Sequence, residues 1–336
     1  MKFSTRSEGN KCPIMITALA VIIILFIVSF YAFYIAMEAE TDIRYMGVKK
    51  VVSEKLTKTV RGMEMNAMNV FDEVGKHLDS PESVIVALES KTSLNPDVRG
   101  YFAAFEPAFF PEKGKWYEPY VHQDDSTGFK VTQVGSARHD YLKSDWYIRA
   151  KKSSDSFWSD PYYYQDNPKV ASGLYCTFVK PVFDSEGRLA CVCGADMTLA
   201  WLTKELKRID NDCKNDDILN AHRMFRNLDY YSMIFTNDGT CIAHPEGKRM
   251  PIKDEGVLRD IAQKKSGVIT MTVNGVSSRL YYAPLESIDW TVGIVVPNAD
   301  NRKPLILVGM ILLTIAVIGM IVIWNIIRRN RKDETG

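Results

Sequence analysis

Aromatic and ionisable side chains are concentrated in one short stretch near the middle of the chain. Residues 139–147 read HDYLKSDWY, and residues 157–162 continue with FWSDPY. Rings with polar groups among them are typical of a small-ligand pocket, which needs apolar walls and a few convergent polar groups. Aromatic residues that pack beneath a long surface loop would give the same composition. The elements around the stretch must distinguish these two interpretations.

Motifs for catalysis or metal binding are absent from the sequence. It has no G-x-S-x-G, H-E-x-x-H, Walker A or glycine-rich dinucleotide motif. The five histidines are scattered, and His222 and His244 have no cysteine partner at zinc spacing. The net charge of +1 gives no basic surplus for nucleic acid. We therefore expect no catalytic residue, no metal, no cofactor and no nucleic-acid partner.

The cysteines do not suggest a disulfide framework. All six lie at positions 12, 176, 191, 193, 213 and 241, without C-x-x-C spacing. Cys12 abuts an apolar run, which leaves five, so at least one of these thiols is free or pairs between chains. Cys191 and Cys193 fall on one strand face, where they are poorly placed to bond to each other. We interpret them as small buried residues rather than as a redox pair.

Two long apolar runs stand near the chain ends. Residues 14–36 and 305–327 each contain 23 residues without a charge. At 1.5 Å per helical residue each spans roughly 35 Å, enough to cross a bilayer. The first run is longer than the apolar part of a signal peptide and lacks a clear cleavage site. A buried core helix is the other alternative, but the run is apolar on all sides. We expect two membrane anchors.

Basic residues flank the outer ends of both runs and predict the orientation of the chain. They are Lys2, Arg6, Lys11, Arg328, Arg329, Arg331 and Lys332. Positive flanks stay in the cytoplasm, so both termini are expected inside a two-pass inner (plasma) membrane protein. Arg302 and Lys303 oppose this assignment but are outnumbered. The region between the anchors is then one external domain.

The external region begins with a helical pattern. From residue 38 to about 78, apolar residues recur every three or four positions, which predicts a long stalk helix continuing from the first anchor. Its expected buried face consists of Tyr45, Val48, Val52, Leu56, Val60, Met63, Val70 and Val74. Ser80 is expected to cap a second, short helix with Pro81 in its first turn.

The pattern then changes to strands in two blocks. In the first block we predict a strand over 100–105, a long loop over 113–125, a strand over 129–134, a helix over 146–152, a hairpin of 175–183 with 189–196, and a helix over 197–209. In that hairpin Cys176 falls close to opposite Asp196. A polar break over 211–217 separates the blocks. The second block has hairpins 233–236 with 240–243 and 267–273 with 276–283, and a last strand over 290–296.

This order of elements resembles the double-Cache extracytoplasmic sensor domains of bacterial signal-transduction receptors. The matching segments are 101–107, 140–141, 146–147, 158–162, 181–188 and 194–197 in the first block, and 235–239, 243–245, 282–285 and 290–293 in the second. The resemblance implies an α/β (α+β) fold with a long stalk helix and two stacked Cache (PAS-like) modules of antiparallel sheet flanked by helices. The expected division is 1–13 cytoplasmic, 14–36 membrane, 37–79 stalk, 80–210 distal module, 211–303 proximal module, 304–327 membrane and 328–336 cytoplasmic.

The resemblance also implies where a ligand binds. In that family the distal module holds the ligand, and the implied positions here are Trp146, Tyr147, Tyr162 and Asp196. Amino-acid binders of the family carry an arginine two residues before the tryptophan, where this chain has Ser144, and an upstream tyrosine that is replaced by His139. A bidentate carboxylate clamp is therefore missing.

The residue types favour an amine or a zwitterion as the ligand. Asp196 and the rings suit an ammonium group, whereas His139, Lys143 and Arg138 would favour an anion. The candidate ligand-binding residues are Trp146, Tyr147, Tyr162, Asp196, Lys143, His139 and Tyr141. Each of these residues could instead have a purely structural role: a helix cap for Asp196, core packing for Tyr162 and a solvated surface charge for Lys143.

Binding is expected to produce a signal. The predicted stalk and the last strand each lead into an anchor, so closure of the pocket would move one anchor against the other, with a homodimer as the expected assembly. We expect a non-enzymatic sensor whose partners are a small molecule, the lipid bilayer and a cytoplasmic effector of chemotaxis or two-component type. A stand-alone subunit that signals through a membrane partner, and a surface scaffold, are the alternatives.

Overall fold

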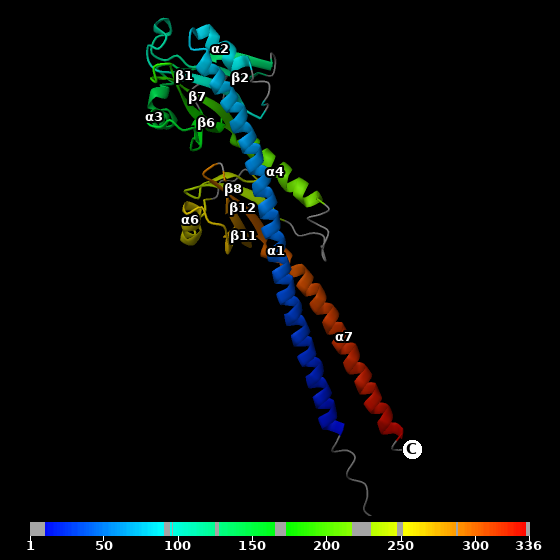
Figure 1. The fold of residues 1–336 in the computed structure, drawn as a ribbon. Coiled ribbons are helices and arrows are strands. Elements are labelled where there is room, and N and C mark those ends of the chain that lie inside the picture. Colours follow the sequence, from blue (N-terminus) through cyan, green and yellow to red (C-terminus); the bar gives the residue numbers. More distant parts are fainter. Residues whose placement is uncertain are drawn as a thin grey trace, which may run out of the picture.

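A single very long helix organises the molecule. The computed structural model describes residues 11–90, 95, 97–124, 128–164, 173–216, 230–246, 251–286 and 288–333. Helix α1 (Lys11–Lys76) runs along the whole length of the molecule, and two α+β modules are stacked along its outer half (Figure 1). Helix α7 (Asn298–Asp333) lies beside its inner half. The expected fold class, a stalk helix with two sheet modules, is confirmed.

The stalk is held by the apolar face that its sequence predicts. The positions named above from Tyr45 to Val74 are all buried against the two modules. A helix with such a face gains most of its stability from burial, so the chain stays helical from the first apolar run to Lys76. Helix α2 (Pro81–Ser90) follows after a short break. Its expected cap is confirmed, because the Ser83 amide donates to Ser80 Oγ at 3.2 Å.

The distal module is a seven-stranded antiparallel sheet. Its path is β3-β2-β1-β7-β6-β4, with β5 also paired to β6. The strands are β1 (Gly100–Phe105), β2 (Pro119–Asp124), β3 (Gly128–Gln133), β4 (Phe157–Trp158), β5 (Tyr162–Tyr164), β6 (Gly173–Phe183) and β7 (Leu189–Thr198). Alternation along β1 divides its side chains, so that Tyr101 packs in the core shared with α1 while Phe102 faces the short helix α3 (Asp145–Lys151).

Two predictions about this module are corrected, and a third is made exact. The stretch 113–125 was expected to be a loop, but β2 occupies its second half and pairs with β1 and β3. In the β6–β7 hairpin Cys176 lies close to Asp196, as expected, but Thr177 is the residue directly opposite, because a register irregularity near Phe183 shifts the pairing by one residue. Helix α4 (Leu199–Asn215) begins two residues later than expected and continues into the predicted polar break.

The end of β7 explains the shifted helix. Thr198 is the residue that caps α4, since its side chain accepts a hydrogen bond from the Trp201 amide at 3.1 Å. Asp196 remains inside the strand, paired with β1 and β6. The alternative role for Asp196 as a helix cap is therefore excluded, and its carboxylate is left for other contacts.

The proximal module is a five-stranded antiparallel sheet in the order β10-β11-β12-β8-β9. It consists of β8 (Tyr231–Thr236), β9 (Cys241–Ala243), β10 (Gly267–Val273), β11 (Val276–Pro284) and β12 (Trp290–Pro297), with helix α6 (Glu255–Ala262) beside it. Asn274 and Gly275 both have positive φ, 52° and 78°, as the predicted tight hairpin requires. β12 passes directly into α7.

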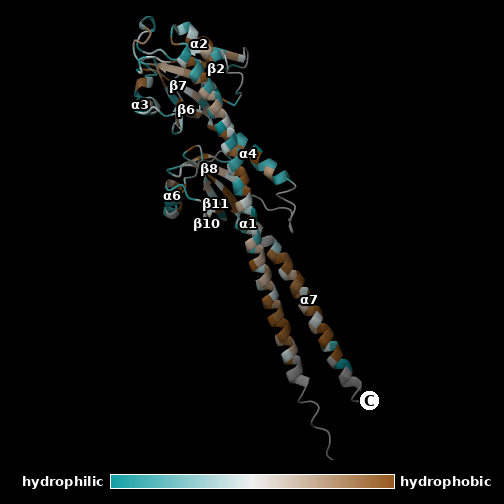
Figure 2. Cartoon of the chain, in the orientation of Figure 1, coloured by the Kyte–Doolittle hydropathy of each residue, from teal (hydrophilic) through white to brown (hydrophobic). Residues whose placement is uncertain are grey.

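The apolar runs form the inner halves of α1 and α7, brown in Figure 2. Both helices are long and apolar enough to cross a membrane, and these windows are not buried in the molecule. They lie side by side, with the Phe30 ring near Gly309. They are candidate transmembrane helices at either end of the two modules. The basic residues Lys2 and Arg6 lie outside the described part of the chain.

The cysteines behave as the sequence suggests. Cys176, Cys191, Cys193, Cys213 and Cys241 are buried free thiols. The sulfur atoms of Cys191 and Cys193 lie 3.8 Å apart without a bond. Because the apolar surroundings raise the pKa of both Cys176 and Cys191, these thiols stay protonated and unreactive.

Polar contacts tie both modules to α1. Near the inner end, Arg279 of β11 bonds to Glu38 and, at 3.0 Å, to Asp42, which also accepts from the Tyr281 hydroxyl at 2.7 Å. Higher up, Trp158 of β4 donates from Nε1 to Glu64 Oε1 at 2.7 Å. The Trp158 ring also lies 5.9 Å, between centroids, from the ring of Trp290 at the start of β12. Trp158 thus contacts the helix from one membrane segment and the strand that enters the other.

Candidate ligand-binding site

A cavity of about 560 Å³ opens between α3 and the segment that carries β4 and β5. The predicted residues His139, Lys143, Trp146 and Tyr162 line it, as does Arg138, which would favour an anion. Arg149, Ser159 and Asp160 also line it and were not among the candidate residues. The volume is in the range of small-molecule pockets. We call it the outer cavity.

A second, much smaller cavity of about 20 Å³ lies deeper, against the sheet. It is lined by Phe102, Glu118, Tyr120, Val134, His139, Trp146, Tyr162 and Asp196. His139, Trp146 and Tyr162 line both spaces and therefore stand between them. We call this second space the inner cavity.

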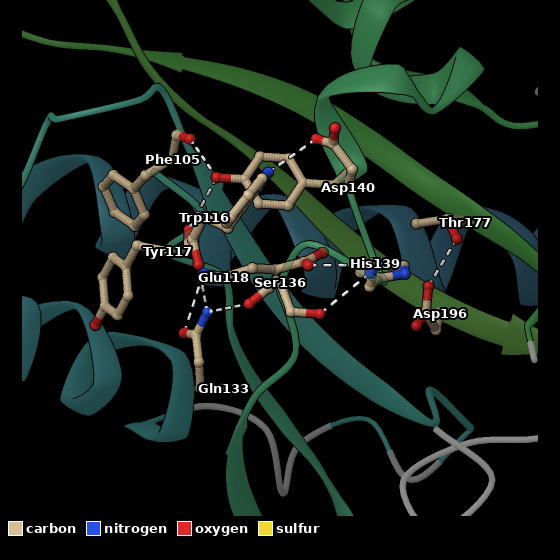
Figure 3. A network of polar contacts seen from close by, with 12 residues as sticks. Phe105, Trp116, Tyr117, Glu118, Gln133, Ser136, His139, Asp140, Thr177 and Asp196 are labelled. Carbon is tan, nitrogen blue, oxygen red and sulfur yellow. Dashed lines mark hydrogen bonds and ion pairs between the residues drawn. The ribbon is translucent and has the colours of Figure 1, made fainter. Parts of the chain in front are cut away.

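Asp196 is the acidic centre of the inner cavity. Its Oδ1 accepts from Thr177 Oγ1 at 2.7 Å and from the Tyr162 hydroxyl at 3.3 Å (Figure 3 shows the first bond). The hydroxyl oxygens of Tyr162 and Thr177 lie 2.7 Å apart and are hydrogen-bonded to each other. Burial raises the pKa of Asp196 to about 6, although the surrounding hydroxyl groups oppose the shift. The hydrogen bonds from these hydroxyl groups therefore hold the buried carboxylate in place.

Glu118 supplies a second carboxylate to the same cavity. Its side chain is almost fully buried, and Oε2 lies 3.4 Å from His139 Nε2 (Figure 3). Burial raises the pKa of Glu118, and the neighbouring His139 opposes that rise. The backbone of Glu118 is fixed to β3, because its amide donates to Gln133 Oε1 at 3.1 Å. Glu118 also raises the pKa of Asp196, because the two carboxylates repel each other electrostatically.

Aromatic rings form the apolar wall of the inner cavity. Phe102 and Tyr120 lie opposite each other on β1 and β2. The Trp146 ring approaches Phe102 to 5.0 Å between centroids. Ring faces around two carboxylates attract an ammonium group and offer nothing to a carboxylate. The inner cavity is thus suited to a cation.

Three predicted residues lie away from the inner cavity. Tyr141 and Tyr147 line neither cavity and are fully buried, with hydroxyls that donate to Phe105 O at 2.6 Å and to Glu106 Oε1 at 2.9 Å. They fix the segment of α3 that carries Trp146. Lys143 is on the rim of the outer cavity, largely exposed, with Nζ 3.0 Å from Asp140 Oδ2.

The sequence reasoning missed Glu118, Tyr120 and Phe102. All three line the inner cavity. The loop expected at 113–125 concealed Glu118 and Tyr120, whereas Phe102 lies in the strand that was predicted over 100–105. The signal that would have found Glu118 and Tyr120 is the alternation of Glu118, Tyr120 and His122 after Trp116. In the part of the chain that the structure describes, no group of three His, Cys, Asp or Glu side chains is arranged to hold a metal.

Comparison with known proteins identifies the architecture. Residues 84–204 match the model of the methyl-accepting chemotaxis protein-like first PDC sensor domain. The chain has the fold of a double-Cache, PDC-type sensor domain. No curated protein sequence matches it.

Solved sensor-domain structures share the fold of this chain at low sequence identity. The periplasmic sensory domain of the Campylobacter jejuni chemoreceptor Tlp1 has a TM-score of 0.63 at 14% identity, covering 80% of this chain and 99% of its own. The extracellular domain of a histidine kinase, mmHK1S-Z3, gives 0.60 at 20%, covering 80% and 97%. The ligand-binding domain of the Pseudomonas fluorescens chemoreceptor CtaA, solved with L-isoleucine, gives 0.54 at 16%, covering 80% and 97%.

Proposed function

We propose that this chain is a membrane-anchored extracytoplasmic sensor that binds a small amine, or a zwitterion held by its amine, in the distal module. The observation that carries the proposal is the pair of buried carboxylates, Asp196 and Glu118, in one cavity walled by aromatic rings. Two buried acids without a ligand are costly, and a cationic partner offsets that cost. We propose no catalytic activity for this region.

The amine end of the ligand is proposed to enter first. The position two residues before Trp146 is Ser144, so the inner cavity has no arginine for a carboxylate. Arg138 and Arg149 line only the outer cavity. A zwitterion would therefore place its carboxylate outward, near these residues, whereas a simple amine would leave its tail in the outer cavity.

The pH dependence of binding follows from Asp196. Its pKa of about 6 is above the unfolded value, so the protonated form stabilises the free fold. This stabilisation is complete below about pH 4 and is lost as pH rises through about 6. Ligand affinity changes in the opposite direction, because an ammonium group pairs only with the carboxylate.

Calorimetry on the full chain with three matched ligands tests the proposal. Isoamylamine, L-leucine and isocaproate share the isobutyl group but carry an amine, both groups, or only a carboxylate. Isoamylamine is expected to bind, and its affinity should fall about tenfold between pH 7 and pH 5 as Asp196 is protonated. Binding of isocaproate alone would contradict the proposal. Binding of L-leucine as tightly as the amine would identify the ligand as a zwitterion.

We further propose that binding moves α1 and α7 relative to each other, and that both termini are cytoplasmic. Ser159 of the outer cavity is bonded to Thr177 through two hydrogen bonds, and the adjacent Trp158 contacts Glu64 and Trp290. A shift of this segment on ligand binding is therefore passed to both membrane helices. The signal then reaches a cytoplasmic effector, in the same polypeptide or a membrane partner.

A homodimer is part of the same proposal. Ile43, Met46 and Met65 are exposed apolar side chains on the stalk, outside the candidate membrane segment. Such residues are suited to contact with a second copy of α1.

Trp158→Phe is expected to uncouple binding from this movement. The substitution keeps a ring against Trp290 but removes the bond to Glu64, a loss of about 1–3 kcal/mol for a hydrogen bond to a charged group. The test is the yield of a disulfide between cysteines placed at positions 30 and 309 (Phe30→Cys and Gly309→Cys, with Cys12→Ser). Isoamylamine should change this yield in the chain with Trp158, and should change it much less in the chain with Trp158→Phe. Isoamylamine affinity should stay within about twofold.

The matched control is Trp201→Phe. It removes an equivalent bond, from Trp201 Nε1 to Asp97 Oδ1 at 2.9 Å, which does not involve α1. The control should retain the crosslinking response. If Trp158→Phe responds to the amine like the parent chain, this coupling route is wrong.

A further inference from the structure

The inner cavity is too small for the ligand that its chemistry favours. Its volume of about 20 Å³ has room for about one water molecule. An ammonium group with the first carbon of its chain needs more. One of the side chains between the inner and outer cavities must therefore move before a ligand can reach Asp196 and Glu118.

His139 is the side chain best placed to move. Trp146 packs against Phe102 and Tyr147, and Tyr162 is bonded to Thr177. The backbone of His139 is fixed instead, because its amide donates to Ser136 Oγ and its carbonyl accepts from the Ser136 amide, each at 3.1 Å (Figure 3). The imidazole can then rotate about this fixed backbone into the outer cavity, which it also lines.

In the closed arrangement the imidazole occupies the position of a cation. Its Nε2 lies 3.4 Å from Glu118 Oε2, and both side chains are largely buried, 15% and 4% exposed. A protonated imidazole in this position neutralises a carboxylate that otherwise has a high desolvation cost.

We propose that His139 is a tethered competitor of the ligand: in the empty sensor it pairs with Glu118, and the ammonium group of an entering amine replaces it there. The ligand class is a primary amine with a slim, unbranched first carbon. This proposal rests on the proposed function, since it needs an amine site at Asp196.

Other charged and titratable groups surround this exchange. Those that line the same cavities as His139 are Glu118 directly before β2, Tyr120 from β2, Asp196 from β7, Tyr162 and Tyr163 from β5, Arg138 and Asp140 beside it, Lys143 from η4 (Tyr141–Lys143), Asp145 and Arg149 from α3, and Asp160. Asp140 is already paired with Lys143 and with Trp116 Nε1, at 3.0 and 2.9 Å.

His139→Gln tests the competition on the full chain, with isoamylamine as the probe. Glutamine keeps a polar side chain of similar length but cannot become a cation. If the closed arrangement holds about nine-tenths of the empty molecules, the variant should bind the amine about tenfold more tightly. The gain over the parent chain should grow as pH falls towards about 5, because only the imidazolium competes.

Glu118→Gln completes a double-mutant cycle. The Glu118→Gln substitution by itself should weaken amine binding. In a chain that already carries Glu118→Gln, adding His139→Gln should no longer increase the affinity for the amine. Thermal melting of each variant checks that it is folded.

The outcomes separate this inference from the proposed function. If His139→Gln binds the amine no more tightly than the parent at any pH, while Asp196→Asn abolishes binding, His139 is not a competitor but the amine site stands. If the parent does not bind the amine and His139→Gln does, the competition is supported in its strongest form. If neither binds it, both proposals are overturned.

Discussion

Replacing Asp196 by asparagine is expected to remove amine binding. The substitution deletes the negative charge but keeps the shape and an oxygen that can accept from Thr177 Oγ1. Loss of one partner of a buried charge pair costs about 2–5 kcal/mol, which corresponds to a dissociation constant weaker by more than about thirtyfold. Calorimetric titration of Asp196→Asn with isoamylamine near pH 7 measures this directly.

Unfolding does not account for such a loss. Since burial already raises the pKa of Asp196 to about 6, the charged carboxylate is an unfavourable group in the empty protein at pH 7. The Asn variant should therefore melt at the same temperature as the parent or higher. Asp160→Asn is the matched control, because this exposed acid lines the outer cavity alone, and its effect on binding should be within about twofold. If Asp196→Asn bound the amine as tightly as the parent chain, Asp196 would not be the residue that binds the ammonium group.

Gly194→Ala is expected to damage the fold of the distal module. A Cβ at Gly194 would lie 2.1 Å from the ring of Phe102 on β1 and 2.8 Å from Thr177 Cγ2 on β6, the two strands that flank β7. β7 cannot yield, because it is bonded to strands on both sides. Overpacking of this kind costs about 1–3 kcal/mol, and the displaced Phe102 ring would also enter the inner cavity.

The thermal midpoint of the full chain, followed by circular dichroism, measures the effect. Gly62→Ala makes the same chemical change in α1, where nothing lies within 4 Å. It should stabilise the chain by about 0.5–1 kcal/mol, because alanine favours a helix. The two substitutions thus have opposite expected signs. A Gly194→Ala variant as stable as the parent would show that the ring of Phe102 has room to move.

Periodicity alone predicted the organising helix and most of the strands. In α1 the burial of Val52, Leu56 and Val60 follows their spacing, because a helix face is a local property of the sequence. The Asn274-Gly275 turn was predictable for a similar reason, since only a few residues adopt its backbone conformation.

The site was only partly predictable, because it depends on register and pairing. Asp196 and Trp146 came from a family resemblance, and both line the inner cavity. Glu118 directly precedes a strand that begins with Pro119 in an aromatic, polar stretch, whereas Asp196 lies on β7, far along the chain, which pairs with the neighbouring strand β1. Nothing local shows that its carboxylate and that of Asp196 share one cavity. The shift that places Thr177 opposite Asp196 likewise arises at an irregularity near Phe183, which the turn sequence does not reveal.

The unbroken course of α1 also sets how far the site stands from the lipid. Glu38 is the first acidic residue after the apolar run, and Glu64, the partner of Trp158, comes about 26 residues later. At the rise of an α-helix this places the level of the outer cavity roughly 40 Å beyond the bilayer core. The potential of charged headgroups decays within about 10 Å at physiological salt. Under the proposed function, a cationic ligand is therefore not enriched at the pocket by anionic lipids, and the chain responds to the concentration of the bulk solution rather than to that of the membrane surface.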